Sequence, residues 1–354
     1  MTKTKNTLIT ICVLASVVAA GCGGSGSQAD ASKTTSVSGG TSGGVLVGAG
    51  STFVYPLMTE WIKDYAEADK GTITYGPIGS GGGIESISSN VVDFGASDAP
   101  LTPDQKAKCS GCVQIPWAVA GTSIPYNVPG APKHLKLTGD VLSRIYLGTI
   151  TSWDDPAIAK LNPGARLPSL EITPLHRSDS SGTTFNFTDY LSHVSSPWKS
   201  KVGVGTSVSW PVGTGAKGSS GLAGLLSRTR GAIGYVDAAY SLQSGFAYAA
   251  VRNRAGKFVL PDNANVAAAA ATVKTVPPDN AISIVDPSAT ATAAYPISTF
   301  TYAIVHTHSP KSQQLKRFLT YAIGPGQEFG ADLEFSKLPA VVLEANRETI
   351  AKLS

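Results

Sequence analysis

The sequence predicts an α/β protein in which a parallel sheet is flanked by helices. Short apolar segments alternate with amphipathic ones between residues 45 and 120, in the order strand, helix, strand, helix, strand. The chain beyond residue 44 is also long enough to divide its hydrophobic core between two domains. Together these observations indicate a doubly wound architecture with more than one domain.

The first elements are identified from apolar spacing and from glycines. Residues 44–49 form a short apolar strand. The next segment is predicted to be a helix, because four large side chains recur at a spacing that places them on one helical face. They are Leu57, Trp61, Ile62 and Tyr65. Residues 72–78 are the next strand, the glycine-rich segment 79–83 opens a second helix, and residues 91–98 are a buried strand ending in a loop.

The same alternation continues to the C-terminus. A helix is expected over residues 137–150, a strand over residues 172–176 and an apolar helix over residues 185–191. The remaining expected elements are strands at 231–236 and 297–305, and helices at 266–273, 312–322 and 339–353.

The N-terminus has the pattern of an export signal. Lys3 and Lys5 precede the apolar run 8–20, which is too short to cross a bilayer. Residues 1–21 are therefore expected to be a signal peptide that is removed on export.

The boundary of this signal resembles a bacterial lipobox. Residues 19–22 read AAGC, with Ala19 where leucine is usual, so Cys22 is expected to be lipidated. An ordinary signal peptide with an incidental Cys22 is the alternative. Residues 22–44 are almost wholly Gly, Ser, Thr and Ala, a composition that predicts a flexible tether. The protein is thus expected to be held at the outer face of the bacterial cell membrane.

Charge and cysteine usage exclude some functions. The formal net charge of +4 is too weak to indicate a nucleic-acid partner. Cys109 and Cys112 are expected to form a local disulfide in an exported protein. A redox-active pair is the alternative, and a zinc site would need two more ligands, none of which is near in the sequence.

Three loops place small residues and hydroxyls between a predicted strand and a predicted helix. They are GSTF at 50–53, GSGG at 79–82 and SSGTT at 180–184. The unpaired N–H groups and the dipole at a helix start bind anions, and Ser or Thr adds a hydroxyl donor. One such loop is usually only a cap, but three in one chain favour a shared anion.

Three charged residues narrow the identity of this anion. Arg177 ends a strand just before the third loop, where its guanidinium can contact two oxygens, and Asp179 can hold it in place. Asp98 ends another strand, and an ionised carboxylate only accepts hydrogen bonds. An anion beside Asp98 must therefore carry a proton, which phosphate does near neutral pH and sulfate does not.

These motifs together resemble the phosphate-binding proteins of the bacterial phosphate-specific (Pst) ABC transporters. The segments that carry the resemblance are GAGSTF at 48–53, IGSGG at 78–82, VDFGASDAPL at 92–101, IYLGTITSWD at 145–154, AKLNPG at 159–164, RSDSSGTTF at 177–185, WP at 210–211 with KG at 217–218, and GAIGYV at 231–236. The similarity extends in order over residues 45–354.

The resemblance implies a two-lobed periplasmic-binding-protein-like fold of type II, in which each lobe is a mixed sheet flanked by helices. Lobe I would be residues 45–125 plus 295–354, lobe II would be residues 126–294, and a hinge would join them. It also implies a monomer that binds inorganic phosphate between its lobes and passes it to the permease subunits of an ABC importer, without a cofactor.

Site residues are transferred from the family by position. The residues expected to contact phosphate are Ser51, Thr52, Phe53, Ser80, Asp98, Arg177, Ser181, Gly182 and Thr183, with Asp179 supporting Arg177. Ser51 stands where some members have alanine.

Other functions receive weaker support. A secreted phosphomonoesterase would use Ser181 as its nucleophile, but it needs a base or a metal, and the five histidines are scattered. A binder of another oxyanion and a surface adhesin are further alternatives. No metal-ligand cluster is evident, so neither a metal nor a catalytic residue is predicted.

Overall fold

The computed structural model describes residues 44–68 and 70–354. The predicted signal peptide, Cys22 and all but the last residue of the predicted tether lie outside the described residues. The described residues belong to one compact unit, Thr41–Ser354.

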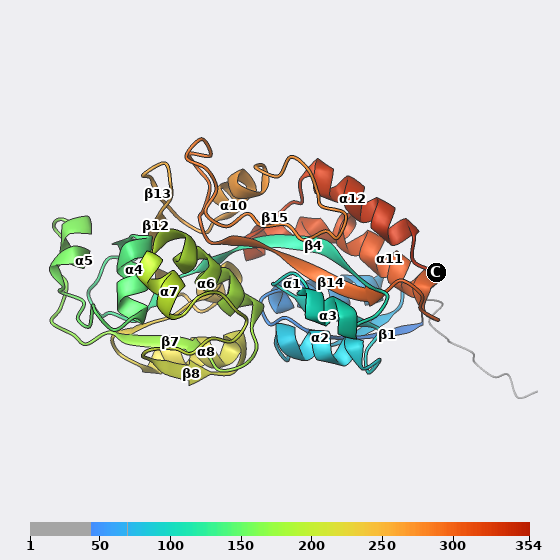
Figure 1. Cartoon of the computed structure of the whole chain (residues 1–354), viewed down its shortest axis with the longest axis horizontal. Helices are drawn as coiled ribbons and strands as arrows, with labels where there is room; N and C mark the ends of the chain where they lie inside the picture. Colours follow the sequence, from blue (N-terminus) through green and yellow to red (C-terminus); the bar gives the residue numbers. More distant parts are fainter. Residues whose placement is uncertain (1–43, 69) are drawn as a thin grey trace, which may run out of the picture. The chain divides into compact units, whose positions relative to one another are not determined.

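A seven-stranded mixed sheet is built mainly from the N-terminal and C-terminal parts of the described chain. Its strands are β1 (Val45–Gly50), β2 (Thr72–Gly76), β3 (Phe94–Ser97), β4 (Cys112–Ser123), β10 (Val236–Asp237), β14 (Ser298–His306) and β15 (Phe335–Ser336). The first three are parallel, as the sequence predicted, whereas β14 runs antiparallel to both β3 and β4 (Figure 1). The parallel strands β1 and β3 thus end at the same edge, where Ser51 and Asp98 follow them.

Two smaller sheets are formed by the middle of the chain. The strands of the five-stranded sheet are β5 (Pro125–Tyr126), β7 (Thr173–Arg177), β8 (Thr214–Ala216), β9 (Ala232–Ile233) and β11 (Ala247–Tyr248). The strands of the three-stranded sheet are β6 (Lys136–Leu137), β12 (Ala250–Arg252) and β13 (Phe258–Val259). Because β7 is parallel to β8 and β9, Arg177 lies at the carboxyl edge of the five-stranded sheet.

Helices connect and cover these sheets. In the parts of the chain that build the seven-stranded sheet they are α1 (Tyr55–Glu67), α2 (Ser80–Ser88), α3 (Pro103–Lys108), α11 (Ser312–Ala322), the 3-10 helix η1 (Pro325–Leu333) and α12 (Ala340–Ala351). In the middle of the chain they are α4 (Gly139–Tyr146), α5 (Pro156–Leu161), α6 (Gly182–Val194), α7 (Ser196–Lys201), α8 (Gly218–Arg228), α9 (Ala238–Gln243) and α10 (Asn263–Ala270).

Most predicted elements differ from those of the structure by a few residues at their ends, and two differ in kind. The helix expected over residues 137–150 is only α4, because Gly148 adopts a left-handed φ of 75° that ends the helix. The strand expected over residues 231–236 is divided into β9 and β10, which belong to different sheets. The chain passes between the sheets at Gly234, whose N–H donates to the Pro125 carbonyl at 2.9 Å.

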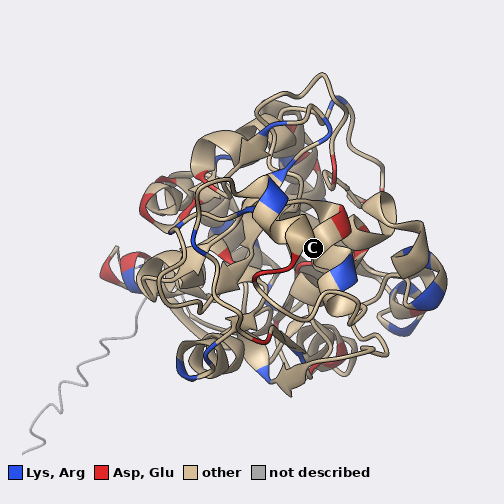
Figure 2. Cartoon of the chain, turned by 90° about the vertical axis from the view of Figure 1, so that its left-hand side faces the viewer, with Lys and Arg blue, Asp and Glu red and all other residues tan. Residues whose placement is uncertain are grey.

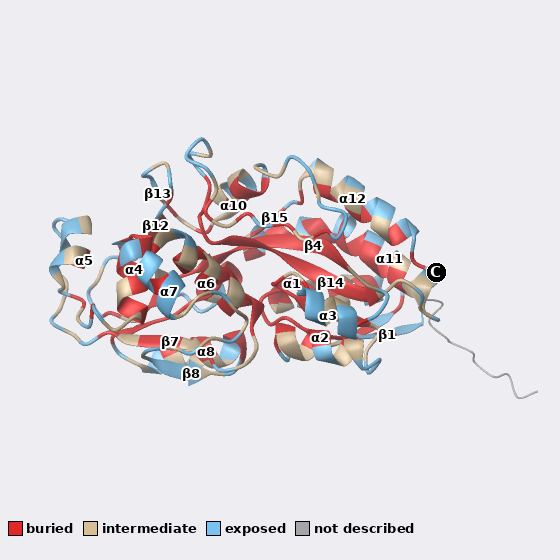
Figure 3. Cartoon of the chain, viewed as in Figure 1, coloured by how far each residue is buried: buried red, intermediate tan, exposed pale blue. Residues whose placement is uncertain are grey.

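The core is centred on β4 and β14. Both strands are buried along nearly their whole length, because the sheet is covered on both faces (Figure 3). Trp117 of β4 packs edge-on against Trp61 of α1 and Phe318 of α11, with ring centroids 5.3 and 6.1 Å apart. This aromatic cluster fixes α1, and therefore the loop before α1, against the sheet.

Charges of both signs are interspersed on the side of the molecule drawn in Figure 2. Among the described residues, no helix has both the length and the apolar character that a membrane crossing requires.

Candidate functional site

The loop after β1 lies directly against the end of β3. Gly50 permits this approach: it adopts a φ of 141°, and a Cβ at this position would lie 2.1 Å from the Ala96 carbonyl oxygen. The Ser51 N–H donates to that same carbonyl at 2.9 Å. The Ser51 hydroxyl consequently reaches Asp98 and donates a hydrogen bond to its Oδ1.

Ser51 also organises the two residues that follow it. Its Oγ accepts from the N–H of Phe53 at 3.0 Å and from that of Val54 at 3.3 Å. The Phe53 N–H therefore already has a partner within the protein. The predicted Ser51 and Phe53 lie at the site, but in this structure their polar groups serve Asp98 and the loop backbone.

Ser80, the first residue of α2, joins the second loop to the third. Its Oγ donates to Asp98 Oδ2 at 3.3 Å and accepts from the N–H of Gly182 at 3.1 Å. A Cβ on Gly182 would lie 2.7 Å from Asp98 N and from Ser80 Oγ, so this close approach requires glycine. The start of α2 and the residue after β3 are thus in direct contact with the start of α6.

The start of α6 supplies the third predicted loop. Ser181 is the N-cap residue, and its Oγ accepts from the Thr184 N–H at 3.2 Å. Thr183 is buried, and its Oγ1 lies 3.5 Å from Arg177 NH1. The helix dipole at this end favours an anion, and the N–H groups of Gly182 and Thr184 here have hydroxyl oxygens as partners.

Arg177 is buried and held by Asp179. Its Nε donates to Asp179 Oδ1 at 2.7 Å and its NH2 to Oδ2 at 2.5 Å, a two-point contact. Burial raises the pKa of Asp179, but the hydrogen bonds and charge of Arg177 lower it more, so the pKa falls below its usual range. The remaining guanidinium nitrogen, NH1, faces the cluster formed by Thr183 and Ser219.

A residue that the sequence analysis did not select, Ser219, completes the cluster. Its Oγ lies 2.9 Å from Thr52 Oγ1 and 3.4 Å from Arg177 NH1, and its N–H donates to Thr52 Oγ1 at 3.1 Å. Ser219 lies in the first turn of α8, after β8. The sequence signal was present, because residues 213–219 form a fourth Gly- and Ser-containing segment between a strand and a helix.

Asp98 is the acceptor among these donors. It is 1% exposed, and burial raises its pKa to about 6 against the lowering effects of the Ser51 hydrogen bond and the Arg177 charge. At neutral pH most of it is ionised.

A second buried acid, Asp237, was also missed. Its Oδ1 accepts from the Tyr240 N–H at 3.1 Å, and its Oδ2 has no hydrogen-bond partner among the described residues. Burial raises the pKa of Asp237 well above its usual range, and the nearby charge of Asp98 adds to this effect. Burial and the neighbouring Asp98 thus both favour the protonated form of Asp237.

The structure thus brings together every residue that the sequence assigned to the site. Ser51 and Ser80 donate to one ionised carboxylate, Asp98, and Gly182 at the N-terminus of α6 lies against it. The Arg177 guanidinium contacts Thr183 and Ser219, and Ser219 contacts Thr52. A cavity of about 260 Å³ lies beside Thr52 and is also lined by Tyr55, Lys217, Gly218 and Tyr240. This arrangement suits a small anion that carries its own proton.

Comparison with known proteins agrees with this chemistry. A profile of the PBP superfamily domain matches residues 29–325. The chain is 40% identical over 342 residues to the phosphate-binding protein PstS of Xylella fastidiosa (strain Temecula1 / ATCC 700964), covering 93% of both proteins. It is 38% identical over 305 residues to the phosphate-binding protein PstS of Pasteurella multocida (strain Pm70), covering 84% of this chain and 88% of that protein.

Solved structures match the fold. A high-affinity periplasmic phosphate-binding protein (PfluDING) bound with phosphate gives a TM-score of 0.70 at 22% identity, covering 86% of this chain and 93% of that chain. A putative phosphate ABC transporter substrate-binding protein with bound phosphate from Clostridium perfringens gives a TM-score of 0.62 at 19% identity, covering 83% and 100%. The predicted two-lobed α/β fold is confirmed by these neighbours.

Proposed function

Since the chain belongs to the PstS family of phosphate-binding proteins, within the PBP superfamily, we propose that its buried donor cluster captures inorganic phosphate for an ABC-type importer. The observation that carries the proposal is the pairing of one ionised acceptor, Asp98, with a surrounding set of hydroxyl and guanidinium donors. An anion enters this cluster without repulsion only if it donates a proton to Asp98.

The donors of the cluster, the predicted ones and Ser219, have roles consistent with their positions. Thr52, Ser80 and Ser219 donate hydroxyl hydrogen bonds, and NH1 of Arg177 donates a charge-assisted one. The hydroxyl–hydroxyl contacts seen here are exchanged for contacts with phosphate oxygens. Thr183 offers its N–H at the α6 start, with the Ser181 hydroxyl beside it. Gly182 offers its N–H when the Ser80 hydroxyl, its present partner, turns to phosphate. The Phe53 N–H can donate to phosphate once the Ser51 hydroxyl has rotated away from it.

The two lobes are proposed to close over the anion by a hinge. The chain leaves the seven-stranded sheet at Ser123 and enters the five-stranded sheet at Pro125, near the proposed boundary between residues 125 and 126. The strand β10 lies within the proposed lobe II but pairs with β4 of lobe I. Lobe II, residues 126–294, is therefore tied to lobe I by strand pairing as well as by the hinge.

Export, lipidation at Cys22 and attachment to the outer face of the membrane by the tether of residues 22–44 are part of this proposal. The proposal also includes delivery of phosphate to permease subunits and function as a monomer. The support is the sequence pattern of the N-terminus and the family to which the chain belongs.

A catalytic role has less support. The phosphomonoesterase alternative needs a free nucleophile, whereas Ser181 Oγ accepts from the Thr184 N–H and is 1% exposed. Among the described residues, no histidine hydrogen-bonds to this hydroxyl. We therefore propose that the protein binds phosphate without hydrolysing esters.

Titration calorimetry of the full chain, stripped of bound anion, tests the proposed function. Phosphate is expected to bind one-to-one with micromolar or tighter affinity, and sulfate to give no heat at neutral pH. Heat with sulfate alone would assign the site to another oxyanion. No heat with either anion would favour the phosphatase or adhesin alternative, which a phosphatase assay then separates.

Sulfate rejection is expected to depend on pH. As the pH falls through about 6, Asp98 takes up a proton and becomes a donor to a sulfate oxygen. Sulfate binding should therefore appear as the pH is lowered from 8 to 5, as measured by competition against labelled phosphate. Sulfate binding in Asp98→Asn should change little over the same range, because the amide does not titrate.

Ser219→Ala tests the residue that the sequence analysis missed. Loss of one neutral hydrogen bond is worth about 0.5–1.5 kcal/mol, so phosphate affinity should fall by roughly 2- to 12-fold. Ser227→Ala is the matched control, because Ser227 is an exposed serine of the same helix whose hydroxyl donates to the Gly224 carbonyl at 2.9 Å. Equal affinities for the two variants would remove Ser219 from the phosphate site.

A further inference from the structure

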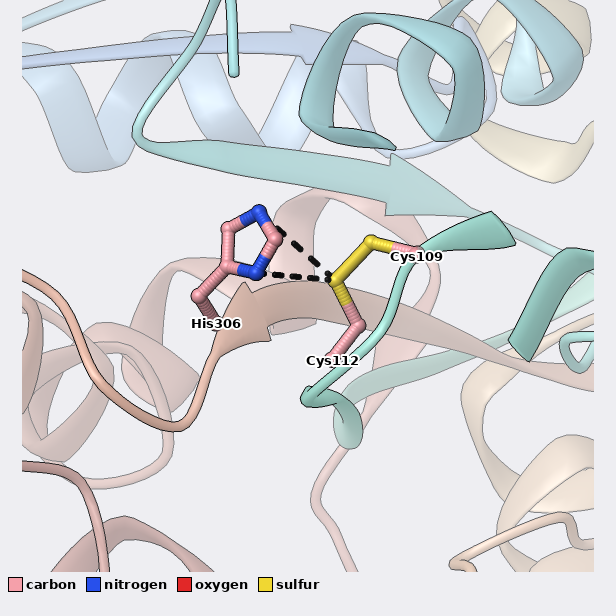
Figure 4. Close-up of side chains that lie close together, drawn as sticks. All are labelled: Cys109, Cys112 and His306. Atoms are coloured by element: carbon pink, nitrogen blue, oxygen red, sulfur yellow. Dashed lines mark hydrogen bonds between the residues drawn. A yellow bond between two sulfur atoms is a disulfide. The ribbon is translucent and has the colours of Figure 1, made fainter. Parts of the chain in front are cut away.

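A cluster of two cysteines and one histidine lies outside the phosphate site. Cys109 follows α3, Cys112 begins β4, and the two form the predicted disulfide. His306 ends β14 and lies opposite Cys112 in the antiparallel ladder, so the two side chains share one face. The ring Nδ1 of His306 lies 3.6 Å from Cys112 Sγ (Figure 4).

A contact with a backbone carbonyl determines which ring nitrogen of His306 carries the proton. The other ring nitrogen keeps its lone pair, and it is the one that faces the sulfur. The Nε2 of His306 lies 3.1 Å from the Ile87 carbonyl oxygen. A carbonyl oxygen only accepts, so Nε2 carries the proton and Nδ1 keeps its lone pair. Histidine ligands of metals commonly have this arrangement, with the second ring N–H donating to a carbonyl. His306 therefore has the orientation of a metal-binding histidine.

We propose that Cys109, Cys112 and His306 bind one Zn²⁺ ion when the disulfide is reduced, with water as the fourth ligand. The two sulfurs and the histidine nitrogen lie within 4.8 Å of one another. The Cys-x2-Cys spacing is that of zinc-binding pairs, and Cys and His are the ligands that zinc prefers. His306, which is 194 residues from Cys112, is one of the two ligands that the local sequence lacked.

The surroundings fit a neutral complex. Cys109 packs among Ile84, Ile87, Leu101 and Ile304, where an uncompensated charge would be costly. Zinc with two thiolates and a neutral imidazole has no net charge. A cavity of about 200 Å³, lined in part by Cys112 and Lys106, provides an entry path.

The ion and the disulfide exclude each other. A dithiol reductant transfers two electrons and two protons to the Cys109–Cys112 bond and becomes a disulfide itself. Zinc then displaces the two thiol protons to solvent and forms two sulfur–metal bonds. The redox state of Cys109 and Cys112 therefore determines whether the chain has the disulfide or can bind zinc.

The test uses the full chain with Cys12→Ser and Cys22→Ser, so that only Cys109 and Cys112 supply thiols. After reduction and removal of the reductant, Zn²⁺ affinity is measured by competition with a chromogenic chelator. Cd²⁺ is then added to follow the thiolate-to-cadmium absorption band. One ion per reduced chain is expected, and none per oxidised chain.

His306→Ala should weaken zinc binding by about 100-fold or more, because loss of an outer-shell partner alone costs 10–100-fold. His308→Ala is the matched control, because His308 contacts Ser354 at an exposed turn. Far-ultraviolet circular dichroism verifies the fold of each variant, and Cys112→Ser serves as a second loss-of-ligand variant. The proposal is overturned if the reduced parent takes up no stoichiometric ion, or if both loss-of-ligand variants bind zinc as tightly as the parent.

Discussion

Arg177→Ala is expected to weaken phosphate binding by roughly 10- to 150-fold, because a charge-assisted hydrogen bond is worth about 1.5–3 kcal/mol. The guanidinium is buried, and its NH1 faces Thr183 and Ser219 in the centre of the donor cluster. The affinity should fall for every anion tested, because the interaction does not depend on the proton that the anion carries. Calorimetric titration of the stripped variant with phosphate measures this loss.

The same substitution should lower stability. Asp179 makes a two-point contact with Arg177, and removal of one partner of a buried ion pair costs about 3–5 kcal/mol. Without Arg177, Asp179 keeps the N–H of Gly218 as a donor but has lost its cation. Arg177→Ala/Asp179→Ala should recover part of this stability, since no carboxylate is left unpaired, and should still bind phosphate weakly. Urea unfolding of both variants separates the two effects.

Arg254→Ala is the matched control for charge. Arg254 also pairs with an aspartate, Asp286, at 2.6 Å, but its side chain is 47% exposed. The Arg254→Ala substitution should leave phosphate affinity unchanged. If Arg177→Ala bound phosphate as the parent does, the assignment of the guanidinium to the anion would be wrong.

Asp98→Asn should mainly erode the discrimination against sulfate. The asparagine amide donates hydrogen bonds where the carboxylate only accepts, so a fully ionised anion no longer meets a repelling group. A charged hydrogen bond at this position is worth about 1.5–3 kcal/mol, which places the gain in sulfate affinity relative to phosphate at roughly 10- to 150-fold. Competition of sulfate with labelled phosphate at pH 8 measures the ratio.

Asp93→Asn controls for the loss of an acid from the same segment. Asp93 pairs with Lys311 at 2.8 Å, away from the donor cluster, and its replacement should leave selectivity as it is. An Asp98→Asn variant that still excluded sulfate as strongly as the parent would show that selectivity arises elsewhere.

Local sequence signals predicted the loops of the site well. Gly50 and Ser80 lie where a predicted strand gives way to a predicted helix, and such transitions can be recognised from the local sequence. Asp98 and Arg177 were found because each ends a strand that the apolar pattern marked clearly. The resemblance to a family then connected these separate loops into one site.

Contacts between distant segments were beyond the sequence analysis. Ser219 reaches Thr52 across 167 positions, and His306 reaches Cys112 across 194, and no local pattern encodes either meeting. The division of residues 231–236 between two sheets was missed for the same reason, because strand partners are chosen by tertiary packing. Asp237, at the end of β10, was overlooked with it.

The pairing of Arg177 with Asp179 has a consequence for the environments in which the protein works. Within the donor cluster one cation is accompanied by two ionised carboxylates, Asp179 and Asp98. The exposed Lys217 at the adjacent cavity only balances the second carboxylate, so the pocket has no surplus of positive charge to attract an anion from a distance. Dissolved salt screens the long-range attraction due to net charge, but it screens buried dipoles and short hydrogen bonds very little. Phosphate should therefore be retained almost as well in brackish water as in fresh water.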